Sequence, residues 1–143
     1  MTTENPTVLD LDDLAALARE TIAERGATYV DPSGAPHYGN PQGDGTYAPS
    51  CYVGDILNRI DPSLLAKVAR ERNISNVRRL FHGGKGTYDG EGAVLVFADD
   101  SALATSSAGL AFLATLQQAN DAHVHYQEAY RRALADGKAA LSG

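Results

Sequence analysis

Apolar side chains recur every three to four positions near the start of the chain, which is the spacing of an amphipathic helix. The pattern covers residues 11–25, where Leu14 and Ala18 fall on the same face. Asp10 precedes the pattern as an N-cap, and Gly26 follows it as a C-cap. We therefore expect a first helix that begins after Asp10 and ends before Gly26.

Three further helices are predicted in the middle of the chain. Ser50 stands as the N-cap of a helix over residues 51–60, whose inner face is apolar. Asp61 and Pro62 begin the next helix, because the missing N–H of proline costs nothing in the first helical turn. A short helix over residues 74–81 follows, so the middle of the chain is predicted to be mostly helical.

The C-terminal part is predicted as one strand and a long helical region. Residues 93–97 are apolar and contain β-branched side chains, which favours a strand. A cap among residues 99–101 then starts a helix, which breaks near Asp121, resumes and stops at Gly137. The buried stripe of this region consists of leucines at helical spacing: Leu103, Leu110, Leu113 and Leu116.

Residues 31–49 interrupt the helical pattern with eight glycines and prolines in nineteen positions, which indicates a loop. Short strands over residues 27–30 and 45–48 flank it, so we expect a hairpin with a long tip. Such a long loop is often functional, although it can equally be a tolerated insertion. Three of its side chains suit ligand contact: His37, Tyr38 and Tyr47.

These elements predict a mainly α fold of five to six helices, with a minor two- or three-stranded β element. A chain of 143 residues fits one compact domain, which we assign to residues 8–137 between a flexible N-terminus (1–7) and a loose C-terminus (138–143). The single cysteine excludes an internal disulfide, and no apolar run reaches the length of a membrane span. The first residues also lack the blocks of a signal peptide, so we expect a cytoplasmic protein without a membrane partner.

Charge is distributed unevenly along the chain. The net charge is −6, but residues 59–85 carry seven basic and two acidic side chains, a balance of +5 that leaves −11 for the rest. An acidic body disfavours nucleic-acid binding, whereas the basic window permits one anion-binding face. Arg78, Arg79 and Lys85 are candidate ligands of a phosphate group, with one of the two loop tyrosines stacking on a base. The alternative for the window is an ordinary solvated helical surface.

Two segments of this window invite a more specific interpretation. Residues 67–75 follow the pattern of the first half of a helix-turn-helix, but the next helix is too short to present several side chains to bases. Residues 82–87 are rich in glycine and include Lys85, but their spacing departs from that of a phosphate-binding loop. We favour a packed helical pair for the first segment and a flexible turn for the second.

Cys51 is a candidate nucleophile because it lies in the first turn of a predicted helix, where unpaired N–H groups stabilise a thiolate. Such a cysteine also needs a base, and nothing in the sequence places a histidine beside it. The alternative, which we favour, is a small buried residue that anchors the start of the helix. The candidate catalytic pair is Cys51 with His82. All four histidines are possible bases: His37, His82, His123 and His125.

His123 and His125 also raise the question of a metal site. On a helix, side chains two residues apart point about 200° away from each other and cannot bind one metal ion together. The surrounding residues predict a helix, so we expect no metal site and no cofactor.

Residues 49–57 read Pro-Ser-Cys-Tyr-Val-Gly-Asp-Ile-Leu, a segment of the type Pro-x-Cys-x-Val-Gly-x-x-Leu. With it, the chain resembles a loose group of small uncharacterised actinobacterial and actinophage proteins that share a C-terminal helix containing Gln and Asp. The chain departs from their pattern at Asn120, His123 and Tyr126, where they carry Gln, Gly and Trp. The resemblance implies an actinobacterial or phage origin and no particular activity. The matching C-terminal residues are Phe112, Leu113, Gln117, Asp121 and Ala129.

The shared residues also have a physical interpretation. Gly54, in the first turn of its helix, allows another backbone to approach closely. Gln117, Asn120 and Asp121 form a polar trio that could satisfy the backbone of residues 31–49. The motif would then be a signature of the fold and not an active site.

The leading hypothesis is a small non-catalytic binding or regulatory protein. Its partner would be a host or phage protein, or a small ligand that contains phosphate. No catalytic set converges in the sequence, whereas an acidic body carries one basic window and one loop rich in Tyr, His and Gly. The alternatives are a cysteine-dependent enzyme that uses Cys51 and a DNA-binding regulator that uses residues 61–81.

Overall fold

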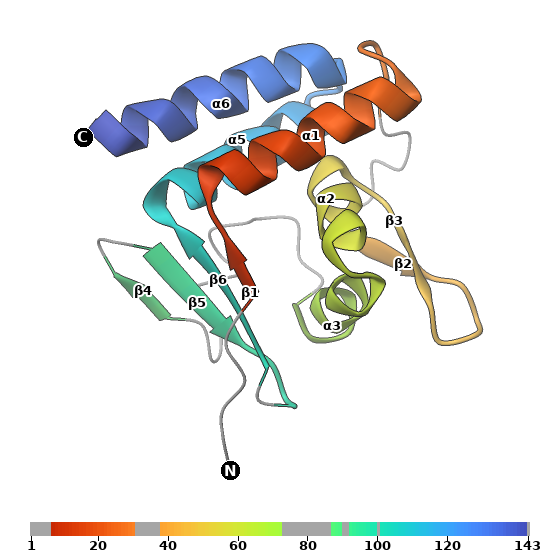
Figure 1. Ribbon diagram of the computed structural model, residues 1–143. Coiled ribbons are helices and arrows are strands. Elements are labelled where there is room, and N and C mark those ends of the chain that lie inside the picture. Colours follow the sequence, from red (N-terminus) through yellow and green to blue (C-terminus); the bar gives the residue numbers. More distant parts are fainter. Residues whose placement is uncertain (1–6, 31–37, 73–86, 90–91, 100, 143) are drawn as a thin grey trace.

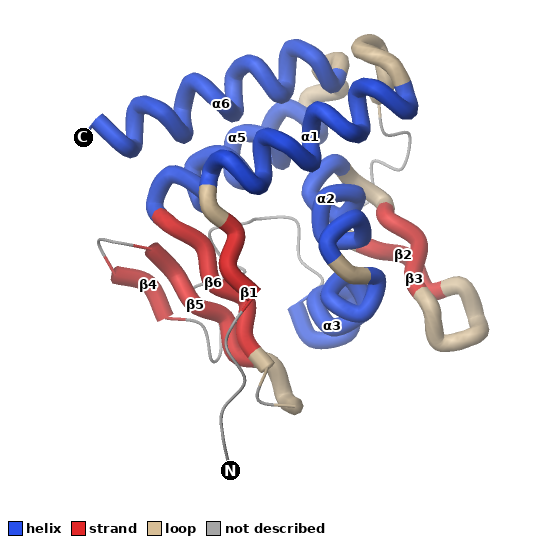
Figure 2. The backbone as a smooth tube through the Cα atoms, viewed as in Figure 1, coloured by secondary structure: helices blue, strands red, loops and turns tan. Residues whose placement is uncertain are grey.

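The computed structural model describes residues 7–30, 38–72, 87–89, 92–99 and 101–142 (Figures 1 and 2). Its five helices in these residues agree with the prediction of a mainly α fold with a minor β part, although the β part has more strands than expected. In chain order the elements are β1 (Thr7–Leu9), α1 (Leu11–Arg25), β2 (Gly39–Pro41), β3 (Tyr47–Pro49), α2 (Tyr52–Ile60), α3 (Pro62–Arg72), β4 (Thr87–Asp89), β5 (Gly92–Val96), β6 (Ala102–Ser106), α5 (Ser107–Asp121) and α6 (Tyr126–Ser142).

The first helix, α1, begins and ends where the sequence predicts. The Asp10 carboxylate accepts a hydrogen bond from the backbone N–H of Asp13 at 3.0 Å, which satisfies a donor that the helix leaves unpaired. Gly26 follows the helix with φ +97°, a backbone conformation that suits glycine. The buried face of α1 consists of Leu11, Leu14, Ala15, Ala18 and Thr21.

The ends of the domain differ from the prediction. Thr7, assigned to a flexible N-terminus, begins β1 and pairs with β6. At the other end, α6 continues through Gly137 to Ser142, so residues 138–142 are helical instead of loose. Gly137 serves packing and not termination, because a Cβ there would lie 2.5 Å from a methyl carbon of Leu11.

The larger sheet has the strand order β1-β6-β5-β4, in which β1 runs parallel to β6 and the other pairs are antiparallel. In β6, Leu103 and Thr105 are buried and their neighbours are half-buried, which is the alternation of a strand with one face in the core. The helix predicted from a cap at residues 99–101 is therefore wrong over its first turn. Helix α5 begins only after Ser106, whose hydroxyl oxygen accepts a hydrogen bond from the Gly109 N–H at 3.0 Å. Pairing with β5 along the whole of β6 outweighs the helix propensity of the alanines in this segment.

The break predicted near Asp121 is confirmed, because α5 ends there and α6 begins at Tyr126. His123 lies in the connection with φ +58°, a left-handed conformation that residues other than glycine rarely adopt. His123 and His125 are both exposed in this connection, so the prediction that they lie on a helix is wrong.

Residues 27–30 do not form the predicted strand. The N–H groups of Tyr126 and Gln127, in the first turn of α6, donate hydrogen bonds to backbone carbonyl oxygens of this segment, each at 3.0 Å. First-turn donors have no partner inside their own helix, so an outside acceptor is required. The segment therefore closes the start of α6.

A second, two-stranded antiparallel sheet is the hairpin of β2 and β3. The strand predicted over residues 45–48 corresponds to β3, but its partner is β2 and not residues 27–30. Each strand of the hairpin ends in a proline, Pro41 in β2 and Pro49 in β3. The hairpin packs against α2 and α3.

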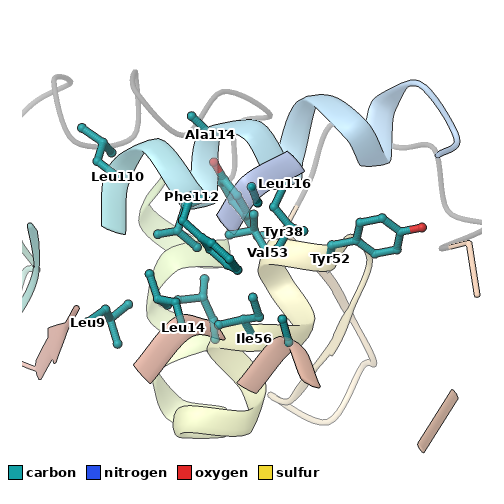
Figure 3. Packing of buried hydrophobic residues seen from close by; sticks show 14 of the residues in the cluster. Leu9, Leu14, Tyr38, Tyr52, Val53, Ile56, Leu110, Phe112, Ala114 and Leu116 are labelled. Carbon is teal, nitrogen blue, oxygen red and sulfur yellow. The ribbon is translucent and has the colours of Figure 1, made fainter. Parts of the chain in front are cut away.

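Three helices, α1, α5 and α6, lie side by side in one layer, with the large sheet below one end and the α2–α3 pair below the other (Figure 1). The core fills the space where these parts meet. Leu14, Ile56 and Phe112, from three different helices, point toward one another in Figure 3, and all three are fully buried. Among the described helices, none combines the length and the apolar composition needed to cross a bilayer.

Candidate functional site

The start of α2 holds the single thiol of the chain and is the candidate site. Cys51 is the N-cap, one residue after the cap predicted at Ser50. Its Sγ accepts a hydrogen bond from the Gly54 N–H at 3.3 Å, and its carbonyl oxygen accepts one from the Asp55 N–H at 2.9 Å. Cys51 is 2 % exposed. The thiol therefore closes the first turn of the helix, as expected of a residue that anchors a cap.

Gly54 is the point where another backbone crosses α2, as the sequence predicts. A Cβ at this position would lie 2.0 Å from the carbonyl oxygen of Tyr38, so no larger residue fits without a shift of the backbone. The same carbonyl oxygen accepts a hydrogen bond from the Ser50 N–H at 3.0 Å. The segment before the hairpin is thus held against the start of α2.

Tyr38 is enclosed by this arrangement. Its side chain is fully buried, and this burial, with smaller contributions from Cys51 and Asp121, raises the pKa of Tyr38 far above its ordinary value. Figure 3 shows the ring among the side chains of the core. Tyr38 is therefore not placed to stack on a ligand at the surface, contrary to the role proposed for it from the sequence.

Asn120 reaches the start of α2 from the last turn of α5. Its Oδ1 accepts a hydrogen bond from the Tyr52 N–H at 2.6 Å. The Tyr52 hydroxyl in turn lies 2.9 Å from the carbonyl oxygen of Tyr29 and 2.8 Å from that of Val124, and these two acceptors share its single hydrogen. These bonds join α2 to α5, to the segment that follows α1 and to the connection between α5 and α6.

The polar trio predicted from the sequence acts differently from the expectation. Asn120 satisfies the backbone of α2 and not that of residues 31–49, of which residues 31–37 lie outside the described part. Gln117 donates from Nε2 to Asp121 Oδ1 at 3.1 Å. The Oε1 atom of Gln117 is buried and accepts no hydrogen bond from the described residues. The trio thus supports the helices.

A partly buried ionic cluster, centred on Asp55, lies on the other side of α2, where it faces α1. Asp55 is buried, and its carboxylate accepts a hydrogen bond from Arg59 Nε at 2.9 Å and another from the Thr21 hydroxyl. Arg25 adds a longer ion pair to Asp55 at 3.8 Å. Hydrogen bonds to Glu24 and Asp55 raise the pKa of Arg59. The hydrogen bond between Arg59 and Glu24 in turn lowers the pKa of Glu24.

This cluster was not predicted, although its signal is present in the sequence. Asp55 and Arg59 are four residues apart, which places them on one face of a helix. Thr21 stands on the apolar face of α1, where a polar residue indicates a buried hydrogen bond. Sequence spacing alone could not show that these two faces meet.

Three tyrosines pack together beside the cluster. The ring centroids of Tyr52 and Tyr126 are 4.3 Å apart, and Tyr29 lies next to both rings. Arg25 lies over the Tyr29 ring, 5.0 Å from its centroid. The Tyr126 hydroxyl is buried near Thr21 without a hydrogen bond of ordinary geometry among the described residues, and burial raises the pKa of Tyr126. The group fills the space between α1, α2 and α6.

The basic window is only partly described, and two of its cations are engaged in the fold. Arg59 belongs to the ionic cluster around Asp55. Lys67 pairs with Asp99 at 3.1 Å and donates a hydrogen bond to Ser101 at 2.9 Å. Ser101 and Lys67 together lower the pKa of Asp99 to about 2. Arg70 is exposed on α3. The predicted ligand residues Arg78, Arg79 and Lys85 lie outside the described residues, as does the predicted helix 74–81.

The thiol and the two described histidines differ in their exposure to solvent. Cys51 is buried, whereas His123 and His125 are exposed in the connection between α5 and α6. The other two candidate bases, His37 and His82, lie outside the described residues. No group of three or more metal-ligating side chains occurs among the residues that the structure describes.

Comparison with protein-family models, with curated proteins and with solved structures finds no match for this chain. A functional proposal therefore depends on the contacts and exposure of its own residues.

Proposed function

We propose that this chain is a small non-catalytic binding protein, of actinobacterial or phage origin, that contacts a host or phage protein. The observation that carries the proposal is the position of Cys51, since the one candidate nucleophile is the buried N-cap of α2. Its sulfur is engaged by the N–H of Gly54. Two further buried polar residues of this region are likewise engaged by neighbouring helices: Asp55 by the Thr21 hydroxyl of α1, and Asn120 by the Tyr52 N–H of α2. The reactive groups of this region thus serve the fold.

The hairpin of β2 and β3 is the surface that we assign to the partner. Residues 40–46 are all exposed, and the tip extends away from α3 in Figure 1. The tip nevertheless has its own hydrogen bonds, because the Gln42 N–H donates to the Thr46 carbonyl and the Thr46 N–H donates to Asp44, each at 3.0 Å. A defined, exposed loop on a rigid base is a common arrangement for binding.

A protein partner is favoured over a ligand that contains phosphate. Two tyrosines are candidates for stacking on a base. Tyr38 is buried and cannot serve in this way, and Tyr47 is half-buried against the core. Lys67, which could have contributed charge, is paired with Asp99. A polar hairpin tip offers hydrogen-bonding groups and shape, which suit a protein surface.

A thermal-shift screen separates the two kinds of partner. A ligand present at a hundred times its Kd stabilises the native state by about 2.7 kcal/mol, which raises Tm measurably. We expect no change in Tm with nucleotides, cyclic dinucleotides or metal ions. A reproducible rise with a nucleotide that is lost in Tyr47→Ala would instead support the phosphate ligand.

A pair of matched variants tests the hairpin as the binding surface. Asn40→Arg places a long charged side chain on the exposed face of β2, and Ala135→Arg places the same side chain on the exposed face of α6. The wild-type chain and both variants are used for quantitative affinity capture from actinobacterial lysate. We expect one partner that Asn40→Arg fails to retain and Ala135→Arg retains. Equal recovery by all three chains would contradict the assignment of the hairpin.

A further inference from the structure

We draw no further inference here: the strongest candidate, the outer face of the four-stranded sheet, where Val94, Val96, Ala102 and Ala104 are half-buried outside the main core, carries none because nothing in the structure shows what covers it.

Discussion

The side-chain oxygen of Asn120 accepts a hydrogen bond from the backbone N–H of Tyr52 at 2.6 Å, across 68 positions of sequence. The donor lies in the first turn of α2, where the helix itself provides no acceptor. The end of α5 therefore fixes the start of α2. Because both groups are buried, loss of the acceptor cannot be compensated by bulk water.

Replacing Asn120 by alanine should destabilise the protein by about 1–3 kcal/mol, the cost of a buried donor left without its partner. The measurement is the free energy of unfolding from urea denaturation. Gln118→Ala, at an exposed position of the same helix, is the control and should change stability by less than about 0.5 kcal/mol. Equal stability of the two variants would show that the Asn120 bond contributes nothing.

The Cys51 thiol should be inert in the native protein because it is buried and caps α2. Iodoacetamide should modify it only as fast as the protein opens, and rapidly once urea unfolds the chain. Cys51→Ser should fold normally, since serine is a good N-cap, whereas Cys51→Ala should lose about 1 kcal/mol of stability. Fast alkylation under native conditions would favour the cysteine-dependent enzyme.

Removal of two tyrosine hydroxyls should have different effects. The Tyr52 hydroxyl bonds to the carbonyl oxygens of Tyr29 and Val124, so Tyr52→Phe should cost about 1–2 kcal/mol. The Tyr126 hydroxyl is buried but lacks a well-formed hydrogen bond among the described residues, so Tyr126→Phe should be neutral or slightly stabilising. Urea denaturation of both variants gives the comparison. A larger loss in Tyr126→Phe would reverse the assignment of the two hydroxyls.

The ionic cluster between α1 and α2 should make stability depend on Arg59 and on pH. Arg59→Met leaves the buried Asp55 with Thr21 and the more distant Arg25, and should cost about 3 kcal/mol, the low end for a broken buried pair. Arg132→Met, which breaks an exposed pair with Glu128, is the control and should leave the stability nearly unchanged.

The sign of the pH effect follows from Glu24. Arg59 lowers its pKa in the folded protein below the ordinary value of 4.5, so the folded protein holds the carboxylate charged more strongly than the unfolded chain does. The resulting stability is fully present above pH 4.5 and is lost as the pH falls through the lower pKa of the folded state. Urea midpoints measured between neutral and strongly acidic pH should fall less steeply in Glu24→Gln. An unchanged slope would exclude this contribution.

Features with a local cause could be predicted from the sequence. The start and end of α1 depend on Asp10 and Gly26, which act on their own neighbours. The close approach at Gly54 was also predictable, because a glycine early in a helix has few other purposes. The identity of the approaching segment, at Tyr38, was not, since it depends on how the chain folds back.

Features that depend on pairing between distant segments could not be predicted. The sequence of β6 predicts a helix because its alanines and leucine are good helix formers, and the ladder with β5 overrides this preference. His123 stands where the resembling proteins carry glycine, and it adopts the left-handed conformation itself, which the sequence pattern does not reveal. The burial of Tyr38, which removes it from the candidate ligand residues, likewise depends on tertiary packing.

The prolines of the hairpin limit how a partner can use it. The inward hydrogen bonds of Gln42 and Ser50 show that even-numbered residues face the other strand, so Pro41 and Pro49 stand where N–H groups would point outward. The outward side of each strand thus lacks one of the donors that an added strand would require. The recognition that we propose for this hairpin would therefore use side chains, and the same prolines disfavour edge-to-edge joining of neighbouring copies into fibres.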